Sequence, residues 1–228
     1  MIKAGLAAAL ATAIGLAAAA GRAEPPPTLL DRVLVRWHAP EAGGPAKPQF
    51  IFERELAFEA RLESLADPDP EPGAYHDRHV RAALERHIAE TLLASLPILP
   101  PPDPKVIAAR AHVAREILEQ RVHGRPKLLE AAAAEGIGDG ELDALSARQA
   151  RASLYLDKMI APMLEPSELE LRDLWRTGTT PFKEQPFDQV VKPLARWYVG
   201  QRLMQALDGY FQNARARVVV SVMRRAAR

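Results

Sequence analysis

Apolar side chains recur at intervals of three and four positions along most of the chain, which is the spacing of helices with one buried face. Prolines at alternate positions of 67–73 and a proline block at 100–102 interrupt this pattern. Asp103 and Pro104 then suit the N-cap and first turn of a new helix. The pattern predicts helices over 53–65, 76–96, 104–122, 127–135, 140–161, 167–176 and 187–211.

Strand patterns lie near both ends of this helical region. The first pattern places Val33, Val35 and Trp37 on one face and Arg32 and Arg36 on the other, and residues 218–222 are rich in β-branched valine. Gln49–Phe52 is a further short apolar run. Because a strand must pair its backbone groups, we predict that the first and last strands meet in one small sheet, with or without residues 49–52. The fold class is therefore mainly α, with a small β-sheet that pairs the N-terminal and C-terminal strands.

The helix predicted over 104–122 has a broad apolar face. This face comprises Val106, Ile107, Val113, Ala114, Ile117 and Leu118. Together with the following short helix it forms a hairpin over residues 104–135. The sequence leaves two interpretations open, in which this hairpin packs on the core or reaches out to a neighbouring protein.

The first residues have the pattern of a secretory signal peptide. Lys3 precedes an apolar run over residues 4–20, and Gly21-Arg22-Ala23 offers a cleavage site before Glu24. The alternative is an uncleaved anchor, because the run approaches the roughly 20 residues that span a bilayer. We favour cleavage, which places residues 24–228 in the periplasm, without stable membrane insertion once processed.

Charge and composition exclude several classes of function. Cleavage would remove two of the 30 basic residues and none of the 29 acidic ones, which leaves a near-neutral chain that is a poor ligand for nucleic acid. The absence of cysteine excludes thiol nucleophiles and thiolate metal sites.

The sequence also offers little for catalysis. His76 and His79 lack a third ligand at metal-site spacing, so we interpret them as solvated polar residues at a helix start. The glycines of 136–140 are not followed by Lys-Ser or Lys-Thr and instead fit a helix end. We therefore predict no enzyme activity, no metal and no cofactor.

The order of elements resembles the chaperone domain of the SurA and trigger-factor superfamily. The phrases that carry the resemblance are 30–35 with the strand-to-helix step at 50–56, the helix 80–88, Ala134-Glu135-Gly136-Ile137 leading to Glu141-Leu142, Tyr155–Ile160 into Pro166–Leu171, and Phe187-Asp188-Gln189-Val190 with Tyr210-Phe211. They cover nearly all of residues 24–228.

The resemblance implies a SurA N-terminal-like domain over 24–228. It would be built from an N-terminal segment, 29–177, and a returning helix and strand, 187–222. In that family parvulin-type prolyl isomerase domains are inserted between these parts. Here only about ten residues separate Arg176 from the returning helix, and the expected isomerase strand and glycine-rich loop are missing, so the isomerase domain is expected to be absent.

The function that the resemblance implies is client holding. We expect an ATP-independent periplasmic holdase for unfolded or partly folded outer-membrane and secreted proteins. The alternative is a structural or assembly subunit that binds one dedicated envelope protein with the same apolar faces.

Four aromatic residues are candidates for client contact. They are Trp175, Trp197, Tyr198 and Tyr210. Such side chains gain from burial against any apolar partner, so they suit a surface without sequence selectivity. Burial in the protein's own core accounts for them equally well, and for Trp197, on the main apolar stripe of its helix, we favour the core.

Overall fold

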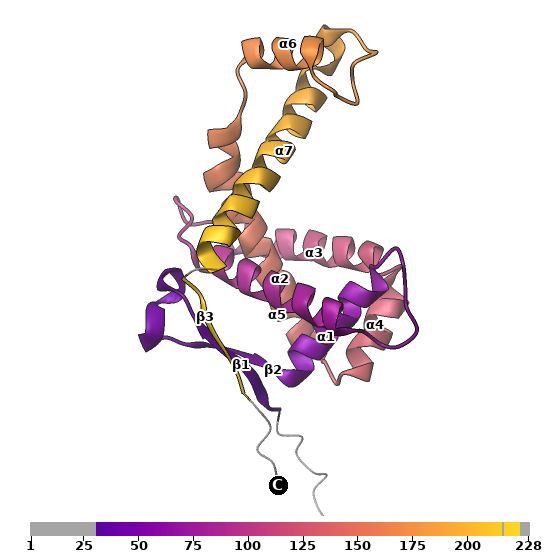
Figure 1. The fold of residues 1–228 in the computed structure, drawn as a ribbon, viewed down its shortest axis with the longest axis vertical. Coiled ribbons are helices and arrows are strands. Elements are labelled where there is room, and N and C mark those ends of the chain that lie inside the picture. The colour runs from indigo at the N-terminus through magenta and orange to yellow at the C-terminus, as the bar shows by residue number, and fades with distance from the viewer. Residues whose placement is uncertain (1–30, 216, 224–228) are drawn as a thin grey trace, which may run out of the picture. The chain divides into compact units, whose positions relative to one another are not determined.

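The computed structural model describes residues 31–215 and 217–223, without the side chains of Asp208 and residues 210–215. Its architecture is mainly α, with one small antiparallel sheet (Figure 1), which confirms the predicted fold class. The predicted signal peptide, residues 1–23, lies outside the described residues.

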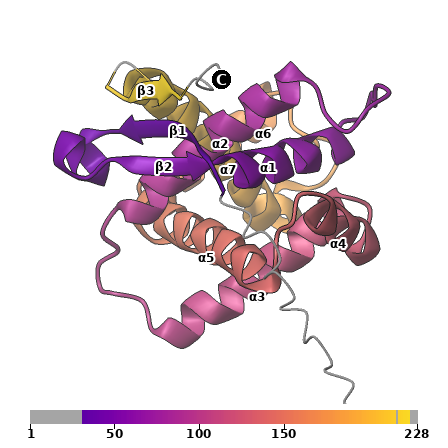
Figure 2. The same ribbon diagram turned by 90° about the horizontal axis from the view of Figure 1, so that it is seen from below.

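The sheet joins the two ends of the described chain. Its strands are β1 (Val33–His38), β2 (Gln49–Phe52) and β3 (Val219–Val222), in the order β2-β1-β3. Trp37 pairs with Gln49 on one side and with Val220 on the other, and Figure 2 shows β1 between its two partners. The prediction that the first and last strands pair is confirmed, and residues 49–52 are the third strand.

The helices follow the predicted order. They are α1 (Glu53–Leu65), α2 (Asp77–Ser95), α3 (Pro104–Arg121), α4 (Arg125–Ala134), α5 (Asp139–Tyr155), α6 (Glu168–Thr177) and α7 (Phe187–Arg215), with the short turns η1 (Pro40–Ala42), η2 (Gly44–Ala46), η3 (Leu156–Ile160) and η4 (Ala161–Leu164). The helix predicted to reach residue 161 ends at Tyr155 and continues as a π-helical and then a 3₁₀ turn. Pro162 cannot donate the backbone hydrogen bond that an α-helix would need there.

Three groups of buried side chains hold these elements together. Val35, Trp37 and Ile51 of the sheet pack against apolar residues of α1 and α2. A second group, which includes Phe58, joins α1 to α3, α4 and α5. The third lies between α6 and α7 around Leu194.

Two predicted helix starts are confirmed in detail. The Asp103 carboxylate accepts a hydrogen bond from the Lys105 amide at 2.7 Å, with Pro104 in the first turn of α3. Ser167 and Glu170 exchange hydrogen bonds at the start of α6. Among the described residues, no helix has both the length and the hydropathy to cross a membrane.

Candidate functional site

The structure brings two of the four predicted aromatic residues together, in the small core between α6 and α7. The Trp175 ring meets the Phe187 ring edge-on at 6.0 Å, and its Nε1 donates to the Gln185 carbonyl at 3.0 Å. Trp197 packs against the same core, as its position on the apolar stripe indicated. Both rings therefore have a structural role within this helix pair.

The other two candidates lie elsewhere or outside the described side chains. Tyr198 is half-buried, and the Arg202 guanidinium lies 4.4 Å from its ring centroid. The side chain of Tyr210 lies outside the described residues. The four residues are thus not shown to form one surface.

A surface pocket on α6 nevertheless reaches Trp175. It has a volume of about 650 Å³ and includes Leu169, Arg172, Arg176 and Phe187 in its lining. Leu169 is 78% exposed, and the Arg172 guanidinium lies 4.6 Å from the centroid of the Phe187 ring. Trp175 can therefore contribute part of its surface to an apolar pocket with a charged border.

A second apolar surface lies on α3, which sequence reasoning did not select as a site. Of the predicted apolar face only Leu118 is buried, whereas Val106, Val113 and Ile117 are 46%, 44% and 59% exposed. α3 packs along α5 and contacts α4, and these contacts cover only part of its apolar face. The exposed remainder is named here the α3 stripe, and it consists of Val106, Val113 and Ile117.

Two residues of the α3 stripe, Val113 and Ile117, line a groove between α2, α3 and α5. The groove has a volume of about 350 Å³. Its apolar lining consists of Leu93, Val113, Ala114, Ile117, Leu118, Ala152 and Leu156, and its polar lining of Glu90, Arg110, Arg121, Gln149 and Ser153. The arginines are paired, Arg110 with Asp157 at 2.6 Å and Arg121 with Glu63 at 3.0 Å. The border therefore presents both signs of charge to a ligand.

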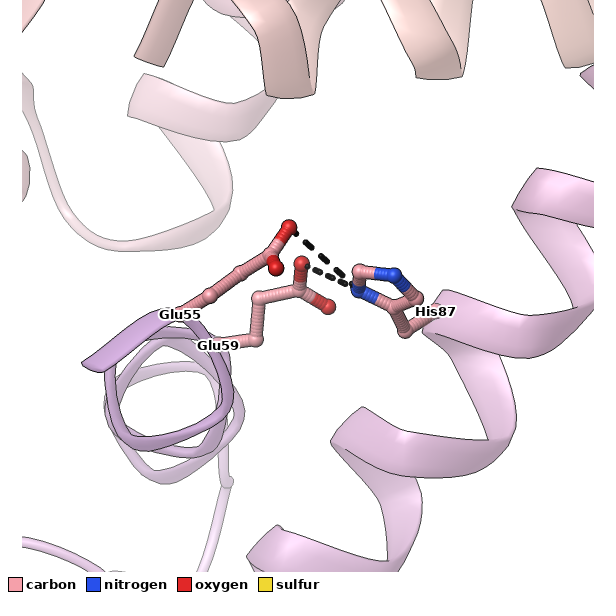
Figure 3. A group of neighbouring side chains, drawn as sticks. All are labelled: Glu55, Glu59 and His87. Carbon is pink, nitrogen blue, oxygen red and sulfur yellow. Dashed lines mark hydrogen bonds and ion pairs between the residues drawn. The ribbon is translucent and has the colours of Figure 1, made fainter. Parts of the chain in front are cut away.

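A cluster of charged side chains joins α1 to α2 (Figure 3), and Glu90, which lines the groove, belongs to the same network. Glu55 and Glu59 stand one turn apart on α1 and both face His87 of α2. The His87 Nδ1 lies 3.0 Å from Glu59 Oε1 and 3.7 Å from Glu55 Oε1. These three residues have the ligand types and spacing of a metal site.

Arg148 of α5 already supplies a cation to these carboxylates. Its guanidinium binds Glu59, lies 3.2 Å from Glu55 and lies 3.4 Å from Glu90. A metal ion on Glu55 and Glu59 would have to displace this buried arginine. The cluster is therefore best explained as a charged network, named here the Arg148 network, that joins three helices.

The Arg148 network shifts the pKa of its members in opposite directions. Burial alone raises the pKa of Glu59, but the hydrogen bond with His87 and the charge of Arg148 together hold it below its ordinary value. Burial raises the pKa of Glu90, because the charge of Arg148 compensates it only in part. The Arg148 pKa is raised: burial lowers it, but its carboxylate partners outweigh this effect.

His76 and His79 are not arranged as a metal pair. The His79 Nδ1 accepts a hydrogen bond from the His76 amide at 3.0 Å, and its Nε2 lies 2.9 Å from the Asp67 carboxylate. The predicted place at a helix start is confirmed, but the prediction that both are solvated is wrong for His79, which is buried.

Comparison of the chain with protein-family models, with curated proteins and with solved structures finds no match. The resemblance to the SurA chaperone domain therefore remains a prediction from the sequence.

Proposed function

We propose that this chain is an ATP-independent periplasmic holdase, which keeps unfolded outer-membrane or secreted proteins from aggregating, and that the groove beside the α3 stripe receives them. The observation that carries the proposal is the exposure of Val106, Val113 and Ile117 along one helix face that borders an apolar groove. Exposed apolar surface of this kind is typical of a site for a protein ligand.

The size of the α3 stripe suits weak and reversible binding. Full burial of one such side chain is worth roughly 1.5–3 kcal/mol, and these three are already about half buried. Covering them therefore contributes about 2–4 kcal/mol, whereas a dissociation constant of about 1 mM corresponds to about −4 kcal/mol. A client must use several such patches, and each patch can release it without the energy of a nucleotide.

The charges around the groove support binding without selection by charge. Arginine and glutamate both border it, and the predicted processed chain is near neutral. A surface of this kind does not attract or repel a client strongly because of net charge. The periplasmic location rests on the predicted signal peptide, and fractionation of expressing cells with an antibody to the chain tests it.

Light scattering of a diluted, urea-unfolded outer-membrane β-barrel protein tests the holdase. The chain is expected to suppress aggregation in the absence of ATP. The double substitution Val113→Glu, Ile117→Glu should weaken suppression, because both charges enter the α3 stripe. The matched control is Ala108→Glu, His112→Glu, which adds the same charges at exposed positions of the same helix with the same spacing.

The result that contradicts the proposal is unchanged aggregation at several-fold excess of the chain. Circular dichroism of both variants ensures that any loss reflects the surface and not unfolding. The dedicated-partner alternative predicts instead that a pull-down from envelope extract yields one stoichiometric folded protein.

A further inference from the structure

The sheet has an open edge at β3. Among the described residues, β3 pairs with β1 on one side and with no strand on the other. All four of its residues are exposed, with Val219, Val220 and Val222 at 52%, 42% and 63%. An unpaired apolar edge of this kind is a ready template for another extended chain.

The register assigns the backbone groups of β3 to its two sides. The Met223 amide donates to the Leu34 carbonyl at 2.9 Å, and this pair follows next after Val35 and Val222 in the β1–β3 register. In an antiparallel pair, positions bonded to the partner alternate with positions that point away from it. Ser221 and Val219 therefore bond to β1, whereas the N–H and C=O groups of Val220 and Val222 point to the open edge.

The opposite edge of the sheet is less suited to pairing. Pro48 directly precedes β2, and the register between β1 and β2 shifts between Val33 and Val35. Prolines and bulges are the devices that protect sheet edges. β3 contains no proline, glycine or charged residue, so the described strand lacks this protection.

The β3 edge is held in place from within the protein. Arg217 Nη2 lies 2.7 Å from Glu41 Oε1, and Val218 packs against the core under the sheet. The strand is thus ordered before any ligand arrives, which lowers the entropy lost on binding.

We propose that the open edge of β3 binds extended segments of unfolded client chains by β-strand addition, an inference that rests on the proposed holdase function. The outward groups of Val220 and Val222 form hydrogen bonds with any extended backbone, so these hydrogen bonds do not depend on the side chains of the client. Valine side chains on both faces favour β-branched and aromatic client residues. Such residues are abundant in β-barrel proteins.

Charge argues against a second copy of this chain as the occupant. Antiparallel pairing places the start of one strand beside the end of its partner. Arg217 is already paired with Glu41, but in the sequence Arg215 also precedes β3, and Arg224 and Arg225 follow it. Two copies would bring like charges together, whereas a client segment with acidic residues beside its apolar stretch would complement them.

The test uses the purified chain and a short fluorescein-labelled peptide of alternating valine and threonine with glutamate at each end. We expect saturable binding by fluorescence anisotropy and slower hydrogen exchange at the Val220 and Val222 amides. Val220→Pro should weaken binding about tenfold or more, because it removes an outward donor and no β1–β3 hydrogen bond. The matched control Val220→Thr keeps that donor and should bind like the original chain.

A second peptide, N-methylated at alternate residues, tests the contact without altering the protein. If the N-methylated peptide does not bind while the unmodified peptide does, the result supports strand addition. The inference is overturned if both peptides bind equally well or if neither binds. It is also overturned if the unmodified peptide binds without slowing hydrogen exchange at the Val220 and Val222 amides. Light scattering separates the two proposals. The β3 inference alone fails if Val220→Pro matches the original chain both in suppressing client aggregation and in binding the peptide. The holdase proposal fails if neither protein suppresses aggregation. In that case the peptide data alone decide the β3 inference.

Discussion

Substitution of Arg148 by methionine should destabilise the fold strongly. Arg148 donates to Glu55, Glu59 and Glu90 from the middle of α5, and its side chain is 15% exposed. Methionine keeps most of the length and apolar contact of the side chain and removes its charge together with its hydrogen-bond donors. The perturbation therefore tests the charged and hydrogen-bonding role of Arg148 apart from its packing.

The expected loss is large, because the substitution leaves carboxylates without their cation. Removal of one partner from a buried ion pair typically costs about 3–5 kcal/mol. For a chain of this size each kcal/mol lowers the melting temperature by about 2–4 °C. We therefore expect a fall of about 6–20 °C in Arg148→Met at neutral pH.

The assays are thermal unfolding, which gives the melting temperature, and urea unfolding, which gives the free energy, both followed by circular dichroism at pH 7 and pH 5. Without Arg148, protonation of the carboxylates relieves the uncompensated charge, so the deficit of the variant should shrink at pH 5. Glu90→Gln is the matched control, and it should stay within about 1 kcal/mol of the original chain, because the ionised form of Glu90 is disfavoured by burial. A deficit below about 1 kcal/mol for Arg148→Met, or one that grows on acidification, would refute this reasoning.

Three further results are expected. The pKa of Glu59 is lower in the folded than in the unfolded protein, so its contribution to stability is present above the unfolded pKa and is lost as the pH falls through the folded pKa. Glu59→Gln should therefore make the free energy of unfolding fall less steeply with acidification, as measured by circular dichroism. Trp37 is fully buried under the sheet, and Trp37→Ala should cost about 3–5 kcal/mol in urea unfolding. The Ser167 amide and Arg202 lower the pKa of Glu170 to about 2. NMR titration should show the Glu170 carboxylate ionised down to near that pH, and Arg202→Met should raise the pKa of Glu170.

Local patterns were sufficient for most of the secondary structure. Alternation over residues 33–37 identified a strand with Val35 and Trp37 on one face, and both are buried. The need to pair the backbone groups of isolated strands led to the β1–β3 contact. These predictions succeeded because each depends on neighbouring residues or on an obligatory hydrogen bond.

The site depends on which elements meet, and a single sequence does not contain that information. Periodicity identified the apolar face of α3 but not which part of it α5 would cover. The spacing of Glu55 and Glu59 places both on one helix face, yet their partners, His87 and Arg148, come from distant segments. Only the packed structure reveals the α3 stripe and the Arg148 network.

Site-specific photo-crosslinking from position 117 tests the central claim most directly. A photoreactive residue there is mixed with an outer-membrane β-barrel protein, either freshly diluted from urea or already folded, and position 108 on the same helix serves as the control. The proposed function predicts crosslinks from position 117 to the unfolded protein alone, and few from position 108. Equal crosslinking from both positions, or none to the unfolded protein, would contradict the claim that the groove beside the α3 stripe holds unfolded clients.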